Sequence, residues 1–225
     1  MTQAKVTRME RLNIGCGSTP TPGWINIDNS WSLKLGRYPF ALRAVCALGL
    51  AGKDQLAFAQ RVKQNNFKIE WANASRRIPF PDQSVSAIYT SHMLEHLDGP
   101  EVRSFLAEAR RVLAVGGILR ISVPDLMKHA RRYVEKSTDA DAFVASTLLA
   151  AEKPKGLSAR LKYVVIGPRH HHWMYDAASL IRLVESAGFS DAVEVPAGTT
   201  TIPDPGELDL RQREEESVYV ESRRK

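Results

Sequence analysis

The sequence has few cysteines, no long apolar run and no block of like charge. Its two cysteines, Cys16 and Cys46, are too few for a disulfide framework, which points to a reducing compartment. The longest apolar stretch, Pro39 to Ala51, is interrupted by Arg43 and is too short to span a bilayer. Residues 1–15 lack the apolar segment of a secretory signal. We therefore expect a cytoplasmic protein with no transmembrane segment.

The overall composition is that of an ordinary globular protein. A length of 225 residues suits one α/β domain, and 44% apolar with 25% charged residues excludes the disordered and fibrous classes. The net charge of +6 favours anionic partners, although many proteins carry such a charge only for solubility. Because no run of Lys and Arg is long enough to form a nucleic-acid arm, the sequence holds no strong nucleic-acid signal.

Short apolar segments alternate with helical patterns, which predicts β/α units and a mostly parallel sheet. Strands are expected over Arg11–Ile14, Trp24–Asp28, Phe67–Trp71, Val85–Thr90, Ile118–Val123, Ala192–Val195 and Val218–Val220. Helices are expected over Pro100–Leu113, Leu126–Glu135 and Asp139–Ala151, and from an Asp176 cap to Ala187, with Gly116–Gly117 and Gly188 as stops. We expect one domain over residues 1–225, with a helical insertion at 31–66 and a helical segment at 137–168 that caps the substrate.

A glycine turn follows the first expected strand, in the segment Asn13-Ile-Gly-Cys-Gly17. Glycines there let the backbone approach a ligand closely. Asp28 ends the second strand, where a carboxylate can accept hydrogen bonds from both hydroxyls of a ribose. A dinucleotide-binding fold needs a third glycine that opens a helix, but Pro20 and Pro22 stand in that stretch. The pattern therefore favours a nucleoside ligand without a pyrophosphate.

Further motifs run through the rest of the chain. They are Asn73-Ala-Ser-Arg-Arg-Ile-Pro-Phe-Pro-Asp82, Ser91-His-Met-Leu-Glu-His96, Phe105 to Asp125, His172-Trp-Met-Tyr-Asp176, Leu180 to Phe189, and Glu216-Ser-Val-Tyr-Val-Glu221. In this order they resemble a class I S-adenosylmethionine-dependent methyltransferase of the small methyltransferase-domain type, from about Leu12 to Glu221. The resemblance implies an α/β fold with a Rossmann-like, doubly wound sheet of seven strands, mostly parallel with an antiparallel last strand. It also implies S-adenosyl-L-methionine as cofactor and S-adenosyl-L-homocysteine as product.

The resemblance also implies the cofactor contacts. The candidate residues are Gly15, Gly17, Asp28, Asn73, Ala74, Ser91 and His92, together with Asn13 and Cys16 of the glycine turn. The short spacing from Gly17 to Asp28 departs from the family and predicts a first helix that is reduced or missing. Asn73 stands where the family usually has an Asp facing the adenine amino group. Its side-chain carbonyl can still accept that hydrogen bond.

Histidines provide the catalytic candidates. His92 and His96 are four residues apart at an expected helix start, with Glu95 between them, so both could reach the cofactor as base or substrate orienter. The alternative is that His92 packs on the cofactor while Glu95 and His96 satisfy local backbone groups. His172, in the tract 170–172, is expected in a loop over the mouth of the site. A zinc site that combines this tract with His92 or His96 is the less favoured alternative, and no metal is expected, because no carboxylate or cysteine stands at ligand spacing beside the tract.

The acceptor is the least specified part of the prediction. Proteins that resemble this one often occur with polysaccharide-assembly enzymes, which favours a small-molecule or saccharide acceptor methylated on a hydroxyl. The basic insertion suits an anionic or lipid-linked substrate, or else it is a solvated helical face. The alternatives are a non-catalytic Rossmann-like binding module, and an RNA or protein methyltransferase. Asp125 and Tyr175 are weaker site candidates.

Overall fold

The computed structural model describes residues 9–17, 19–30, 69–150 and 170–225, together with Tyr38, Phe40 and Ala47. Apart from those three positions, the predicted helical insertion at 31–66 lies outside the described residues. So does the part of the predicted cap from residue 151 to 168.

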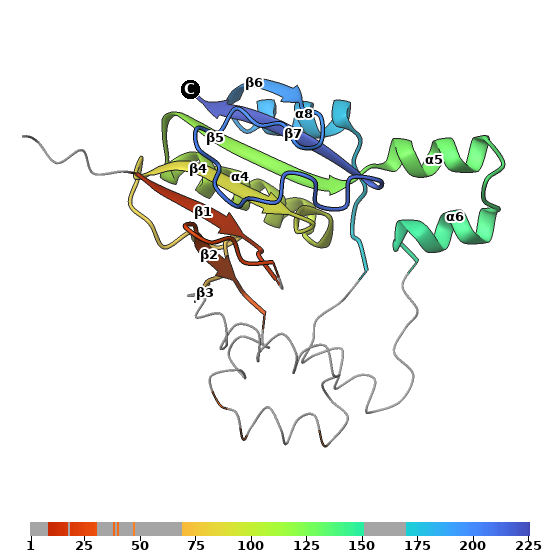
Figure 1. The fold of residues 1–225 in the computed structure, drawn as a ribbon, viewed down its shortest axis with the longest axis horizontal. Helices are drawn as coiled ribbons and strands as arrows, with labels where there is room; N and C mark the ends of the chain where they lie inside the picture. The colour runs from red at the N-terminus through yellow and green to blue at the C-terminus, as the bar shows by residue number, and fades with distance from the viewer. Residues whose placement is uncertain are drawn as a thin grey trace, which may run out of the picture.

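The core of the fold is one seven-stranded sheet with the order β3-β2-β1-β4-β5-β7-β6 (Figure 1). Its strands are β1 (Glu10–Ile14), β2 (Ile25–Asp28), β3 (Ile69–Trp71), β4 (Val85–Ser91), β5 (Leu113–Pro124), β6 (Phe189–Glu194) and β7 (Ser217–Arg224). β7 is antiparallel to β5 and to β6, and the remaining pairs are parallel. The predicted Rossmann-like sheet is thus confirmed. Because the strand order reverses between β1 and β4, ligands are expected at the carboxyl edge beside these strands.

The described helices are α4 (Gly99–Val112), α5 (Leu126–Val134), α6 (Ala140–Thr147) and α8 (Ala177–Ser186), with the 3₁₀ turn η1 (Leu94–His96). Capping boxes start α4 at Asp98 and α8 at Asp176. Figure 1 shows α5 and α6 as a pair that projects from the carboxyl end of β5. None of the described helices has the length and apolar composition needed to cross a membrane.

The two faces of the sheet are covered differently. The apolar sides of α4 and α8 pack with the strands in one cluster, to which Phe105, Leu106 and Leu180 contribute. On the other face, Trp24 and Tyr89 belong to a second cluster, whose members Ile202 and Leu208 come from the segment 195–216. Figure 1 shows this segment, in blue, running across β4 and β5. Within the described residues, an irregular segment therefore covers the face opposite α4 and α8.

A buried ion pair fastens the segment 195–216 to the sheet. Arg120 on β5 is fully buried and is the direct cross-strand partner of Glu221 on β7. The Arg120 guanidinium donates to a Glu221 carboxylate oxygen at 2.7 Å and to the Thr199 carbonyl at 2.8 Å. Glu221 also accepts from Thr200 Oγ1 and from the Thr201 N–H. Burial raises the pKa of Glu221, but the hydrogen bonds from Thr200, Thr201 and Arg120 outweigh it, and the pKa is lowered overall.

Two local predictions were wrong. Gly116 and Gly117 do not stop a helix, because α4 ends at Val112 and both glycines lie within β5. A register shift in the β4–β5 pairing falls beside them, and Gly116 has φ +77°, so glycine allows an irregular strand here. The expected helix start at His92 is also absent. His92 has φ +51°, and only Leu94–His96 form a 3₁₀ turn.

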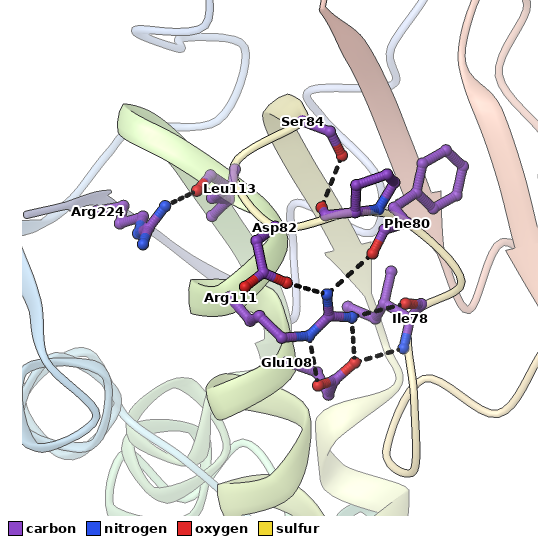
Figure 2. A network of polar contacts seen from close by, with 9 residues as sticks. Ile78, Phe80, Asp82, Ser84, Glu108, Arg111, Leu113 and Arg224 are labelled. Carbon is purple, nitrogen blue, oxygen red and sulfur yellow. Dashed lines mark hydrogen bonds and ion pairs between the residues drawn. The ribbon is translucent and has the colours of Figure 1, made fainter.

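The Pro-Phe-Pro-Asp motif forms a loop that an arginine on α4 holds in place (Figure 2). The Arg111 guanidinium donates to the carbonyls of Ile78 and Phe80, each at 2.9 Å. It also pairs with Asp82 and Glu108, each at 2.7 Å. Glu108 in turn accepts the Ile78 N–H at 2.8 Å. The network explains the motif as a structural clamp on the chain that follows β3.

Replacing Arg111 with methionine is expected to lower the free energy of unfolding by about 2–3 kcal/mol, because several charge-assisted hydrogen bonds are lost at a partly exposed site. Urea denaturation followed by circular dichroism measures the change. Arg110→Met is the matched control, because among the described residues Arg110 makes a single exposed hydrogen bond, to the Gly188 carbonyl at 3.2 Å. Equal stability for the two variants would show that the clamp contributes nothing specific.

Candidate active site

A cavity of about 590 Å³ opens at the carboxyl ends of β1, β2, β3 and β4. This is the edge at which the strand order reverses, and the volume is in the range of small-molecule pockets. The predicted site residues that line it are Gly15, Gly17, Asp28, Asn73, Ala74, His92, His96 and His172. Asn13, Cys16 and Ser91 do not line it. The fold thus gathers most of the candidates, from positions far apart in the sequence, around one cavity.

The glycine turn folds back over the end of β2. The N–H of Gly15 donates to the Ile27 carbonyl at 2.8 Å, and the N–H of Gly17 donates to an Asp28 carboxylate oxygen at 2.9 Å. The other Asp28 oxygen accepts the Ser30 N–H at 2.7 Å. Each oxygen keeps a further acceptor direction, because a carboxylate oxygen has two lone pairs. Asp28 is therefore fixed at the cavity wall with acceptor capacity to spare.

Between Gly15 and Trp24 the described residues form turns and no helix, which confirms the predicted loss of the first helix. Buried Asn13 holds the following loop, since its amide donates to the Thr19 carbonyl at 3.2 Å and to Thr21 Oγ1 at 3.1 Å. Cys16 is buried, and burial raises the pKa of its thiol, so it is an inert packing residue at neutral pH. Asn13 and Cys16 thus shape the turn from behind the cavity.

The side chain of Met93 packs closely over Gly15, which the sequence alone does not predict. Gly15 has φ +71°, and an added Cβ would lie 3.0 Å from the side chain of Met93. Met93 also lines the cavity. The space above Gly15 is thus filled by a flexible thioether, while a Cβ added at Gly17 would be in ordinary contact with the Gly15 carbonyl, at 4.0 Å. Close approach of a ligand to the backbone is therefore available at Gly17.

Asn73 offers a ligand a different group from the one predicted. Its side-chain oxygen accepts both the N–H of Ser75 at 3.0 Å and the hydroxyl of Ser75 at 2.8 Å. Because the Ser75 N–H can only donate, the amide oxygen must face it, and the NH₂ group remains for the cavity. Asn73 is thus a donor on the wall, rather than the acceptor expected for an adenine amino group.

His92 is held at the cavity by contacts on both ring nitrogens. Its Nε2 lies 2.9 Å from Ser217 Oγ, and its Nδ1 lies 3.3 Å from a Glu95 carboxylate oxygen. Glu95 is fully buried, and its second histidine neighbour is His96, whose Nε2 lies 3.9 Å from the same oxygen. One alternative from the sequence was that Glu95 and His96 bind local backbone groups. This is the case for His96, whose Nδ1 donates to the His170 carbonyl at 3.0 Å. Glu95 is the residue that sequence reasoning undervalued.

The histidine tract packs directly against η1. The N–H of His172 donates to the Glu95 carbonyl at 2.6 Å, and the N–H of Trp173 donates to the same carbonyl at 3.3 Å. His171 is buried with its ring 5.1 Å from that of His96, edge to face. Among the weaker candidates, Asp125 caps α5 by accepting the Met127 N–H and does not line the cavity.

A second cavity, of about 530 Å³, adjoins the first. The two share Leu97 and His172 as lining residues. Its wall includes Trp173, which is 62% exposed, together with the polar side chains of Asp98 and Arg103. Tyr175 also lines it, and burial raises the pKa of this phenol to about 12, so it stays protonated at neutral pH. The two cavities thus meet at a histidine that the sequence singles out.

The comparisons with known proteins bear on the fold and on the type of domain. Residues 37–121 match the family model described as a methyltransferase domain. A search of curated proteins gives no match to the chain. Among solved structures, an S-adenosylmethionine-dependent methyltransferase of Thermotoga maritima is 14% identical, with a TM-score of 0.50, over 98% of this chain and 84% of that chain. One from Methanosarcina mazei is 15% identical, with a TM-score of 0.51, over 96% and 92% of the two chains.

A third structure, the PH0226 protein of Pyrococcus horikoshii, is 14% identical, with a TM-score of 0.52, over 97% of this chain and 82% of that chain. At these identities the likenesses show the fold. The family match, the fold and the cavity at its carboxyl edge together support a methyltransferase that uses S-adenosyl-L-methionine as its cofactor.

Proposed function

We propose that the protein transfers the methyl group of S-adenosyl-L-methionine to a hydroxyl of a small-molecule or glycan-type acceptor. The observation that carries the proposal is the pair of adjoining cavities, one with Asp28 and Gly17 on its wall, the other with an exposed tryptophan, which meet at Leu97 and His172. Such an arrangement provides separate places for a nucleoside cofactor and an acceptor, with a titratable side chain between them.

The first cavity suits the cofactor. We assign Asp28 to the ribose hydroxyls, because its carboxylate is held by two backbone N–H groups and still has free acceptor directions. We assign Asn73 and Ala74 to the adenine edge, with the Asn73 NH₂ as a donor to a ring nitrogen. Gly17 gives the ligand access to the backbone. When bound, the cofactor supplies an electrophilic methyl group on a sulfonium.

The second cavity suits a saccharide. The exposed indole of Trp173 offers a broad apolar surface on which a sugar ring can lie, and an indole combines such a surface with a polar tip. Asp98 and Arg103 on the same wall can hydrogen-bond to ring hydroxyls. The preference for a glycan-type acceptor rests on this combination and on the resemblance described above.

His172 is the side chain placed to act on the acceptor, because it lines both cavities. It can orient a hydroxyl of the acceptor and take its proton as the methyl group is transferred. The Nε2 of His92 is engaged by Ser217, and its Nδ1 faces the Glu95 carboxylate, so we assign His92 to positioning at the cofactor side. Positioning of the two reactants supplies most of the rate in such a transfer.

Transfer of labelled methyl from S-adenosyl-L-methionine to a panel of saccharides and small hydroxyl compounds tests the proposal. His172→Gln is expected to lower kcat by about 10²–10⁴-fold, as for loss of a general base, with little effect on the affinity for S-adenosyl-L-homocysteine. Trp173→Ala is expected to raise the acceptor KM instead. Leu183→Val, at the edge of the second cavity, is the conservative control. If calorimetric titration with S-adenosyl-L-homocysteine detects no binding at high micromolar concentration, the proposal is wrong.

A further inference from the structure

Three side chains from two distant segments converge beside the cofactor cavity. A carboxylate oxygen of Glu95, a ring nitrogen of His96 and a ring nitrogen of His171 all lie within 4.8 Å of one another. Glu95 and His96 belong to η1, and His171 belongs to the tract that packs on it. We name these three residues the η1 cluster. No step proposed above uses His171 or the carboxylate of Glu95 directly.

The burial of Glu95 calls for a positive partner. Its side chain is fully buried, and among the described residues neither carboxylate oxygen has a hydrogen-bond partner. An ionised carboxylate in such a place costs several kcal/mol unless a cation or donors compensate it. The groups around it are the imidazoles of His92, His96 and His171, and no described lysine or arginine forms an ion pair with it. Within the part of the chain that the structure describes, a cation bound between Glu95 and these imidazoles would supply such compensation.

The ring of His96 is oriented as that of a metal ligand. Its Nδ1 donates to the His170 carbonyl at 3.0 Å, which leaves the lone pair on Nε2 directed to the side where Glu95 lies, 3.9 Å away. An N–H donated to a backbone carbonyl is the usual support of a histidine that binds a metal through its other nitrogen.

His171 supplies a second nitrogen ligand. It is buried, and its Nδ1 has no hydrogen-bond partner among the described residues. His92 adds support from outside the cluster, because its Nδ1 lies 3.3 Å from Glu95 and can hold the carboxylate in place.

We propose that Glu95, His96 and His171 form a binding site for a divalent first-row transition metal, most suitably Zn²⁺. Two imidazoles and one carboxylate are a ligand set that Zn²⁺ uses in catalytic sites, with a fourth position left open. Bonds of about 2.0–2.1 Å place tetrahedral ligand atoms about 3.4 Å apart. Ligand atoms that already lie within 4.8 Å need only small side-chain movements to reach that spacing.

The metal would join η1 to the histidine tract at the cavity. His96 is the cluster member that lines the cavity, and its side chain is 36% exposed. A metal held by these residues would be next to the cavity through His96, where an oxygen ligand such as water or an acceptor hydroxyl could complete its coordination. The site itself does not depend on the proposed methyl transfer, and its test needs no enzyme turnover.

Untagged protein, stripped with a chelator and then dialysed, is the material for the test. Calorimetric titration with Zn²⁺ is expected to give one site per chain, with a Kd in or below the micromolar range, and saturating Zn²⁺ is expected to raise Tm. Replacement with Co²⁺ is expected to give visible absorption bands of a four- or five-coordinate site. Glu95→Gln and His171→Gln are each expected to weaken Zn²⁺ binding by at least about tenfold.

His170→Gln is the matched control. It removes an imidazole of the same tract but none of the clustered ligand atoms, and it keeps the backbone carbonyl that His96 uses. Its Zn²⁺ affinity is expected to stay within about threefold of the wild type. If the wild-type protein binds no stoichiometric Zn²⁺ and shows no Tm shift, the proposal is wrong. The wild-type measurements decide this even if a variant fails to fold.

Discussion

Replacing Asp28 with asparagine is expected to weaken the binding of S-adenosyl-L-homocysteine on the order of 100-fold or more. Two hydrogen bonds from a sugar diol to a carboxylate contribute about 1.5–3 kcal/mol each, and the amide retains only one of the two acceptors. The carboxylate is also what receives the N–H groups of Gly17 and Ser30, so its loss loosens the glycine turn as well. Isothermal titration calorimetry measures the effect directly.

Asp125→Asn is the matched control for that experiment. Asp125 also follows a parallel strand and accepts a backbone N–H of the next turn, but it does not line the cavity. Its replacement is expected to leave the affinity for S-adenosyl-L-homocysteine within about twofold. If the Asp28→Asn protein bound as tightly as the wild type while remaining folded by circular dichroism, the assignment of the cavity to a nucleoside would fail.

The second large effect concerns stability. Glu221→Gln is expected to lower the free energy of unfolding by about 3–5 kcal/mol, because it leaves the guanidinium of Arg120 buried without a countercharge. In contrast, Glu214→Gln breaks an exposed pair with Arg211 and is expected to cost less than about 1 kcal/mol. Denaturant titrations of the two variants provide the comparison.

The double variant Arg120→Met, Glu221→Gln separates a lost charge pair from lost packing. Its loss of unfolding free energy is expected to be about 1–3 kcal/mol smaller than the sum of the losses in the two single variants, because no unpaired charge remains buried. Simple additivity would contradict a strong pair between Arg120 and Glu221.

The effect of Glu221→Gln also depends on pH in a defined direction. The pKa of Glu221 is lowered in the folded protein. The stabilisation that the ionised carboxylate provides is therefore complete above the unfolded-state pKa of about 4.3. That contribution is lost as the pH falls through the folded-state pKa. The stability gap between wild type and variant is therefore expected to be largest near pH 7 and to narrow below about pH 4.

The sheet and half of the cavity could be predicted from the sequence. The carboxyl ends of parallel strands share one edge, so Gly17 after β1, Asp28 at the end of β2 and His92 after β4 had to lie near one another once the strands were recognised. The motif from Asn73 onward added the next wall in the same way. These inferences use only local patterns and one topological rule.

The remainder depends on contacts between distant residues. Glu95 lies near His171 because the histidine tract packs against η1, and no local sequence pattern predicts that contact. Arg120 was predicted within a strand, but charged residues in strands are usually exposed, and its full burial depends on Glu221 across the β5–β7 pair. The contact between the Met93 thioether and Gly15 likewise could not be predicted, because a flexible methionine side chain can pack in many ways.

The placement of β7 between β5 and β6 has a consequence for synthesis. β6 leaves the ribosome before β7, yet among the described strands β6 pairs only with β7. Until β7 inserts, β5 presents a long unpaired edge, and such edges recruit strands from other chains. A slow or paused translation across residues 195–216 would thus prolong the interval in which nascent copies can aggregate.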